Sequence, residues 1–238
     1  MDKLTKLIVN ADDFGFTDSV SRGIIEAYKD GIVTSTTLMA SLPTAKNAAM
    51  LALENPGLAV GIHFVLTSGY PVSAGVSSLV NLDGRFPKHE EFETKTGINA
   101  DEVEKEFRAQ LERFLSFGLT PSHFDSHHHV HLTDTVRPVV EKLAKEHNVP
   151  VRCYGDVHFI DGFFDETANM EVLCELLNAS KSHDVAEFMC HPGYVDDTLR
   201  SIDSYRDMRE KELAVLTSPE LKQLIEKLNI ELISYKDI

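Results

Sequence analysis

Short apolar runs alternate with segments of helical periodicity along almost the whole 238-residue chain. The runs are rich in β-branched residues, as buried strands are, and the segments between them repeat apolar residues every three or four positions. Strands that alternate with helices in this way form parallel sheets, because each helix carries the chain back to the start of the next strand. The expected strands are KLIVN (6–10), TSTTLMA (34–40), LAVGIHFVL (58–66), SHFDS (122–126), PVRCYG (150–155), VAEFMC (185–190) and ELISY (231–235).

Two of the intervening helices have recognisable ends. One is expected to run from a cap at Asp18 or Ser19 to Asp30, and the other from Asp101 to Phe117, and a glycine follows each. About seven mainly parallel strands with interleaved helices favour an α/β fold, a distorted, TIM-barrel-like (β/α) barrel, over an open sheet.

One interval interrupts the alternation. Residues 67–98 carry glycine, proline and serine with little periodicity, and they follow directly on an expected strand. Loops after the strands of an α/β barrel build its active-site face, so this insertion is expected to form a substrate lid or a dimer contact. A homodimer is therefore an alternative to a monomer, and a surface loop without a role is the remaining interpretation. The length fits one domain, residues 1–238.

The charge balance excludes several classes of partner. Lys and Arg total 23 against 38 Asp and Glu, a formal charge of −15, which repels nucleic acid and anionic lipid. No apolar stretch approaches the roughly 20 residues that span a bilayer, and the first ten residues lack a secretory pattern, so the cytoplasm is the expected location. The scattered Cys153, Cys174 and Cys190 suggest neither a disulfide framework nor a zinc knuckle.

Polar residues that can bind metals or transfer protons gather at the ends of the expected strands. Because parallel strands share one carboxyl-terminal edge, such residues converge although they are far apart in the sequence. The residues in these positions are Asp12, Asp13, His63, Asp125, His127 and His191.

The adjacent carboxylates Asp12 and Asp13 admit two interpretations. Neighbouring residues of a strand point to opposite faces, so the pair serves one site only where the chain bends, and Gly15 is expected to supply that bend. In the functional interpretation one carboxylate binds a metal ion and the other is a general base. In the alternative, Asp13 caps a turn and Asp12 is solvated.

The stretch FDSHHHVHL carries four histidines after an aspartate. If a helix begins here, His127 and His131 share a face; if the chain stays extended, His127 and His129 do. In either register one or two imidazoles reach the site, and the others, including His128, contact substrate, support ligands or lie on the surface. Asp125 is placed to orient a ligand imidazole.

An aspartate and two histidines form a three-ligand site that leaves coordination positions open for water. A divalent ion in such a site acidifies water or polarises a carbonyl, and the mixed ligands suit Zn²⁺, Co²⁺, Mn²⁺ or Mg²⁺. His63 is a candidate ligand, although a lone histidine in an apolar strand is more often a hydrogen-bonded core residue. Hydrolysis also needs a base and an acid, for which Asp12 and His191 are the candidates.

The stretch HPGYVDD follows the sixth expected strand. Pro-Gly after His191 forms a rigid turn that holds the imidazole at the mouth of the barrel. Tyr194 and Asp196 are candidates to contact substrate or to orient His191. Asp196 and Asp197 are equally compatible with a solvated loop.

Taken together, LIVNADDFG, GIIEAYKDGIVTSTTLMA, LAVGIHFVLTSGYPV, PSHFDSHHHVHL and HPGYVDD resemble the YdjC-like carbohydrate deacetylase family, which includes the chitooligosaccharide (chitin disaccharide) deacetylases. The resemblance implies a distorted (β/α) barrel and a divalent metal, commonly Mg²⁺. It also implies hydrolysis of the N-acetyl group of an N-acetylglucosamine-type sugar, such as diacetylchitobiose. It is weaker in residues 70–98 and after residue 150, so it transfers the chemistry better than the substrate.

The same resemblance implies roles for five residues. His63 and His127 would bind the metal with Asp13 as the third ligand. Asp12 would be the base and His191 the acid, by analogy with the NodB-type polysaccharide deacetylases. Hydrolysis of another small amide or ester, including a phosphoester, and sugar binding without catalysis are the competing hypotheses.

Overall fold

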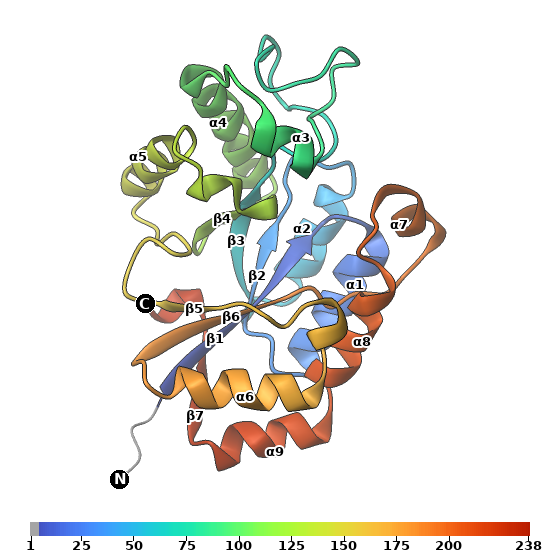
Figure 1. The fold of residues 1–238 in the computed structure, drawn as a ribbon, viewed down its shortest axis with the longest axis vertical. Coiled ribbons are helices and arrows are strands. Elements are labelled where there is room, and N and C mark those ends of the chain that lie inside the picture. Colours follow the sequence, from blue (N-terminus) through green and yellow to red (C-terminus); the bar gives the residue numbers. More distant parts are fainter. Residues whose placement is uncertain (1–4) are drawn as a thin grey trace.

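The computed structural model describes residues 5–238, in which seven strands form one curled sheet surrounded by helices (Figure 1). Every strand pairing is parallel. The strand order is β4-β3-β2-β1-β6-β5, and β7 pairs with β1. The predicted barrel-like α/β fold is therefore confirmed. The strands are β1 (Thr5–Phe14), β2 (Ser35–Leu38), β3 (Ala59–Phe64), β4 (Phe124–Ser126), β5 (His158–Ile160), β6 (Val185–Cys190) and β7 (Ile230–Ile233).

The first strand, β1, lies at the centre of this sheet. It pairs with β6 over residues 6–11, with β7 over residues 5–8, and with β2 from residue 10 onward. Residues 7–14 are buried on both faces, as the continuous run LIV predicts for a central parallel strand. The two aspartates that follow this run therefore emerge between β2 and β6.

Helices pack around this sheet. Figure 1 shows α6 and α9 together below it, α4 and α5 beside β3 and β4, and α1, α2 and α8 on the opposite side. The helices are α1 (Asp18–Lys29), α2 (Ala45–Leu53), α3 (His89–Thr94), α4 (Ala100–Ser116), α5 (Arg137–His147), α6 (Met170–Ser180), α7 (Asp197–Ile202), α8 (Asp207–Leu216) and α9 (Pro219–Lys227). Short 3₁₀ segments are η1 (His127–Leu132), η2 (Asp165–Thr167) and η3 (Tyr235–Asp237).

The two predicted helices exist, but their amino-terminal caps differ from the prediction. Thr17 caps α1 by accepting a hydrogen bond from the Val20 amide, and Asn99 caps α4 by accepting one from the Asp101 amide. Within residues 5–238, the structure contains no helix long and apolar enough to cross a membrane.

The predicted strand at residues 150–155 is wrong. Val151 makes only an isolated bridge with Phe124 of β4. The strand that pairs with β6 at this edge of the sheet is β5, further along the chain. Cys153 has a φ of 64°, which turns the backbone out of the extended conformation. Arg152, the charged residue of the run, is almost completely buried.

The insertion at residues 67–98 is mostly irregular and contains α3 (Figure 1). Buried acidic and amide side chains of α4 fasten it to the sheet. Glu106 accepts hydrogen bonds from the amides of Val72 and Ser73, each at 2.9 Å, and Gln110 bonds both backbone groups of Val65. The insertion is thus held over the exit of β3.

Candidate metal and catalytic site

A β-bulge in β1 brings both neighbouring aspartates to the site. Ala11 pairs with Thr36 but Phe14 pairs with Leu38, so three steps along β1 match two along β2. Asp13 has a φ of 69°, in the left-handed region that aspartate tolerates better than most residues. The bend therefore begins at Asp13 itself, ahead of Gly15. Both carboxylates line the same cavity.

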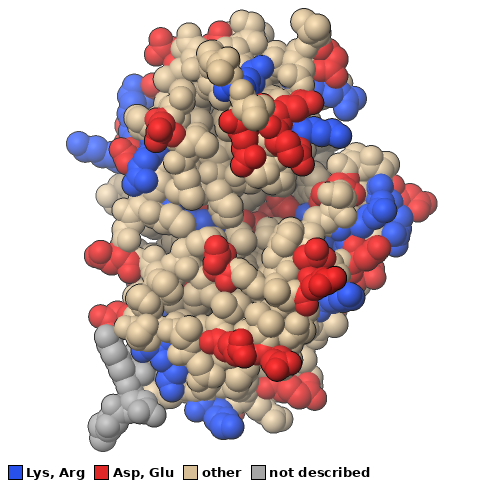
Figure 2. Space-filling view, viewed as in Figure 1, with Lys and Arg blue, Asp and Glu red and all other residues tan. Residues whose placement is uncertain are grey.

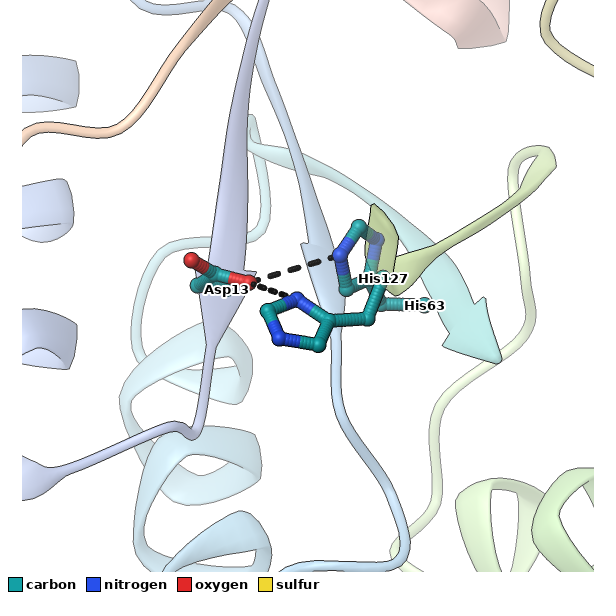
Figure 3. Close-up of side chains that lie close together, drawn as sticks. All are labelled: Asp13, His63 and His127. Carbon is teal, nitrogen blue, oxygen red and sulfur yellow. Dashed lines mark ion pairs between the residues drawn. The ribbon is translucent and has the colours of Figure 1, made fainter. Parts of the chain in front are cut away.

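The Asp13 carboxylate lies between two imidazoles and a guanidinium. Its Oδ1 is 2.9 Å from Nδ1 of His127 and 3.4 Å from Nε2 of His63 (Figure 3). Its Oδ2 accepts a hydrogen bond from Nη2 of Arg209 at 2.7 Å. Burial alone would raise the pKa of Asp13, but the charges of His127 and Arg209 hold it well below 3.8.

This arrangement fits a divalent cation. Ligand atoms of Asp13, His63 and His127 all lie within 4.8 Å of one another. Asp13 Oδ1 is buried and has no partner of hydrogen-bond geometry among residues 5–238. A buried polar atom without a partner calls for an explanation, and an ion between the carboxylate and the imidazoles supplies one.

His63 is oriented from behind by its neighbour on the adjacent strand. The β3–β4 register places it beside Asp125, whose Oδ1 accepts from His63 Nδ1 at 2.7 Å. Thr37 donates to the other oxygen of Asp125 at 3.0 Å. Nε2 of His63 is thereby turned toward Asp13, as in carboxylate–histidine–metal sites. Burial alone would lower the pKa of His63, but Asp125 and Asp13 raise it to about 10, so the site favours positive charge here.

Asp12 is held by a guanidinium. Arg152 donates to both of its oxygens at 2.7 Å, and Asn10 donates to Oδ1 at 2.8 Å. Burial would raise the pKa of Asp12, but the charge of Arg152 lowers it, so the carboxylate stays ionised. Within the described chain, Oδ2 accepts only from Arg152, which leaves one of its lone pairs for another donor.

Arg152 contacts three acidic residues of the site, Asp12, Asp125 and Glu187. It is 3.0 Å from Asp125 Oδ2 and donates to Glu187 Oε1 at 2.8 Å. Asp12, His63 and Asp125 form a second close group of ligand-type atoms. Arg152 contacts both carboxylates of that group, whereas Arg209 contacts only Oδ2 of Asp13 and leaves Oδ1 facing the two imidazoles. The group that contains Asp13 is therefore the better cation site.

His191, at the exit of β6, is surrounded by aromatic rings. The rings of Phe164 and Tyr205 approach it edge-on, with centroids 5.9 and 5.7 Å away. Its backbone amide donates to Glu212 Oε2 at 2.5 Å, and Tyr205 donates its hydroxyl to the other oxygen of Glu212. Burial lowers the pKa of His191 to about 4.

The buried carboxyl of Glu212 is expected to destabilise the fold at alkaline pH. Burial raises its pKa from 4.5 to about 7, so the ionised form is disfavoured in the folded state. The contribution of Glu212 to stability is fully present below pH 4.5 and is lost as pH rises through 7. At pH 8 this loss amounts to about 3 kcal/mol of unfolding free energy. In Glu212→Gln the amide oxygen can still accept from the His191 amide, and the NH2 group can donate to the Tyr205 hydroxyl oxygen. This variant should therefore increase the free energy of unfolding at pH 8 but not at pH 4.5.

Denaturant unfolding at both pH values measures this difference. The exposed Glu231→Gln on β7 is the matched control and should show no pH-dependent change. Equal effects of Glu212→Gln at the two pH values would contradict the assigned cost.

A cavity of about 710 Å³ brings six predicted site residues together. The insertion and the segment after α7 form its opposite walls, and its hollow is visible below α3 in Figure 2, with acidic side chains inside it. The predicted residues that line the cavity are Asp12, Asp13, His63, His127, His129 and His191.

The remaining histidines of FDSHHHVHL adopt neither predicted register. His128 and His129 have φ values of 55° and 52°, so the segment is a kinked 3₁₀ turn. Both line the cavity, and His128 Nδ1 is 2.9 Å from the Thr67 hydroxyl. His131 is fully buried, with Nδ1 2.6 Å from the Ser126 hydroxyl, and it does not line the cavity.

Tyr194 and Asp196 lie outside the cavity lining. Tyr194 donates its hydroxyl to Glu26, and Asp196 caps α7 by accepting from the Leu199 amide at 2.8 Å. A role for either residue in substrate binding stays a prediction.

The chain is similar to several known proteins. Residues 6–227 match the family described as YdjC-like protein. The chain is 46% identical to a carbohydrate deacetylase of Clostridium beijerinckii, over 98% of this chain and all of the relative. A solved structure from Enterococcus faecalis V583, for which cellobiose-phosphate cleavage has been suggested, is 35% identical with a TM-score of 0.93 over 99% of both chains. A family 4 carbohydrate esterase from Streptomyces lividans, in complex with acetate, shares the fold at 12% identity, with a TM-score of 0.55 over 97% of this chain and 92% of its own. The chain therefore belongs to the YdjC-like family.

Proposed function

We propose that this protein is a metal-dependent carbohydrate deacetylase. Its substrate would be an N-acetylglucosamine-type sugar or chitooligosaccharide, such as diacetylchitobiose, and its products acetate and a free amine. The relatedness to a carbohydrate deacetylase supports the reaction class. The observation that carries the proposal is the close group formed by Asp13 Oδ1 and the imidazoles of His63 and His127, in one cavity with Asp12 and His191.

Asp13, His63 and His127 would hold the metal ion. A divalent ion at this position supplies Lewis acidity, both to water and to the acetamide carbonyl. Family resemblance favours Mg²⁺, whereas two imidazoles also suit Zn²⁺, Co²⁺ or Mn²⁺. The carboxylate of Asp125 fixes the ring of His63, and Arg209 fixes the carboxylate of Asp13.

Protons would move through Asp12 and His191. Asp12 accepts a proton from the attacking water, and Arg152 keeps this carboxylate ionised and in place. His191 donates a proton to the amide nitrogen as the carbon–nitrogen bond breaks. Burial lowers the pKa of His191 to about 4, so its imidazole is mostly neutral near pH 7 and must take up a proton before it donates one to the leaving amine.

A neutral sugar is a suitable partner for a chain with a net charge of −15, whereas nucleic acid and membrane surfaces are not. We also propose a cytoplasmic location and a single domain. A homodimer formed through the insertion stays an alternative to a monomer.

Acetate release from a panel of sugars tests the proposed function. We expect release from N-acetylglucosamine or N,N′-diacetylchitobiose, its loss on chelation, and its recovery with one or more of Mg²⁺, Mn²⁺, Co²⁺ and Zn²⁺. Cellobiose phosphate, assayed for phosphate release, serves as the comparison substrate and should not react. Activity that is indifferent to chelation would rule out the mechanism.

A further inference from the structure

Phe164 presents a large apolar surface at the edge of the polar cavity. It is 46% exposed and contributes to the cavity lining. One face of its ring stacks on Tyr205, with centroids 4.1 Å apart and an interplanar angle of 9°. Exposed aromatic surface beside a cavity is typical of a ligand-binding wall.

The ring of Phe164 is held in a fixed relation to His191. Tyr205, on which Phe164 stacks, accepts from the Asp165 amide at 3.1 Å and donates its hydroxyl to Glu212. Glu212 also accepts from the backbone amide of His191. One buried carboxylate therefore positions both the aromatic wall and the proposed acid.

Another phenylalanine of the cavity, Phe16, is less suited to bind a ligand. It is only 6% exposed, the guanidinium of Arg209 lies 5.7 Å from its ring centre, and His127 lies at 5.8 Å. Of these two phenylalanines, Phe164 alone offers an open face to the cavity.

We propose that Phe164 is the platform on which the sugar ring that carries the acetamido group stacks. A pyranose has an apolar face of C–H groups, which packs against an aromatic ring while its hydroxyls remain solvated. The nitrogen that receives a proton from His191 is bonded directly to this ring. The ring must therefore lie beside His191, and the centroid of the Phe164 ring is 5.9 Å from that of His191. This inference rests on the proposed function.

Steady-state kinetics of Phe164→Ala and Phe164→Leu test the platform. We expect KM for N-acetylglucosamine and for N,N′-diacetylchitobiose to rise about 10-fold in Phe164→Ala, the loss of roughly one stacking contact, with kcat almost unchanged. Hydrolysis of methyl acetate, which has no ring, should not change. Tyr70→Ala removes an aromatic ring that is 53% exposed but outside the cavity lining, and it should leave all three substrates unaffected.

Three results for Phe164→Ala would overturn the inference. They are an unchanged KM for both sugars, an equal loss of activity on methyl acetate, or a rise in KM for the disaccharide alone. Calorimetric binding of N,N′-diacetylchitobiose to the wild type and to Phe164→Ala separates this inference from the proposed function. Binding that weakens in Phe164→Ala without acetate release by the wild type would retain the platform and refute the deacetylase. Acetate release by the wild type with a KM that is unchanged in Phe164→Ala would retain the deacetylase and refute the platform.

Discussion

Replacing Asp13 with asparagine is expected to abolish divalent-metal binding and acetate release together. The variant removes the ionised oxygen that faces His63 and His127, so the two imidazoles keep only a neutral amide oxygen as a third ligand. Asparagine is the appropriate replacement because residue 13 has a φ of 69°, which asparagine tolerates and alanine does not. A loss of function then reports on the ligand set rather than on backbone strain.

Metal content after dialysis, calorimetric titration with Mg²⁺ and Mn²⁺, and kcat/KM on N,N′-diacetylchitobiose measure the effect of Asp13→Asn. Metal affinity should fall by at least about 100-fold and kcat/KM by about 1,000-fold or more. His63→Ala should lose metal affinity and kcat/KM together in the same way. Asp197→Asn, an exposed change of the same chemistry on α7, should alter neither. Metal retained at full stoichiometry in both ligand variants would place the ion elsewhere.

The part of the site that lies at strand exits was predictable from the sequence. Asp13, His63 and His127 follow apolar runs that form strands, and parallel strands end at one edge. The alternation of runs and helical segments therefore predicts their convergence without knowledge of side-chain contacts. Each of these residues is positioned by its own strand, which is local information in the sequence.

The residues that hold the predicted side chains in place were not predictable in the same way. Arg152 pairs with a carboxylate 140 positions earlier, and Arg209 with one 196 positions earlier. Arg152 lies in a run that was assigned to a strand, and its charge in the apolar stretch PVRCYG was the available signal. Arg209 and Glu212 belong to α8, where charged residues ordinarily face solvent. Their burial depends on how the helix packs, which no local pattern encodes.

Backbone conformation limited the prediction at two further places. Asp13 and the pair His128–His129 adopt left-handed φ values without glycine. A left-handed φ at a residue other than glycine costs free energy, which contacts elsewhere in the structure must offset. The local sequence therefore gives little indication that these residues adopt it. Both lie in the wall of the cavity, where the bulge and the kinked turn direct side chains toward one point.

Asp12→Asn is expected to lose turnover but keep the metal. The variant removes the proposed base, so kcat should fall by about 100-fold to 10,000-fold. The ligand atoms of Asp13, His63 and His127 do not include Asp12, and metal affinity should change only a few-fold. The fold should survive because Arg152 still faces Asp125 and Glu187. kcat, metal titration and the thermal unfolding midpoint are the measurements.

Asp125→Asn is the matched comparison, because Asp125 also pairs with Arg152 but orients His63 instead of lining the cavity as Asp12 does. Its metal affinity should fall about 10-fold to 100-fold, and its activity should recover when the metal concentration is raised. Activity of Asp12→Asn should not recover in this way, since the missing group is the proton acceptor. If Asp12→Asn instead loses metal as Asp125→Asn does, the ion lies among Asp12, His63 and Asp125, and Arg152 must move to admit it.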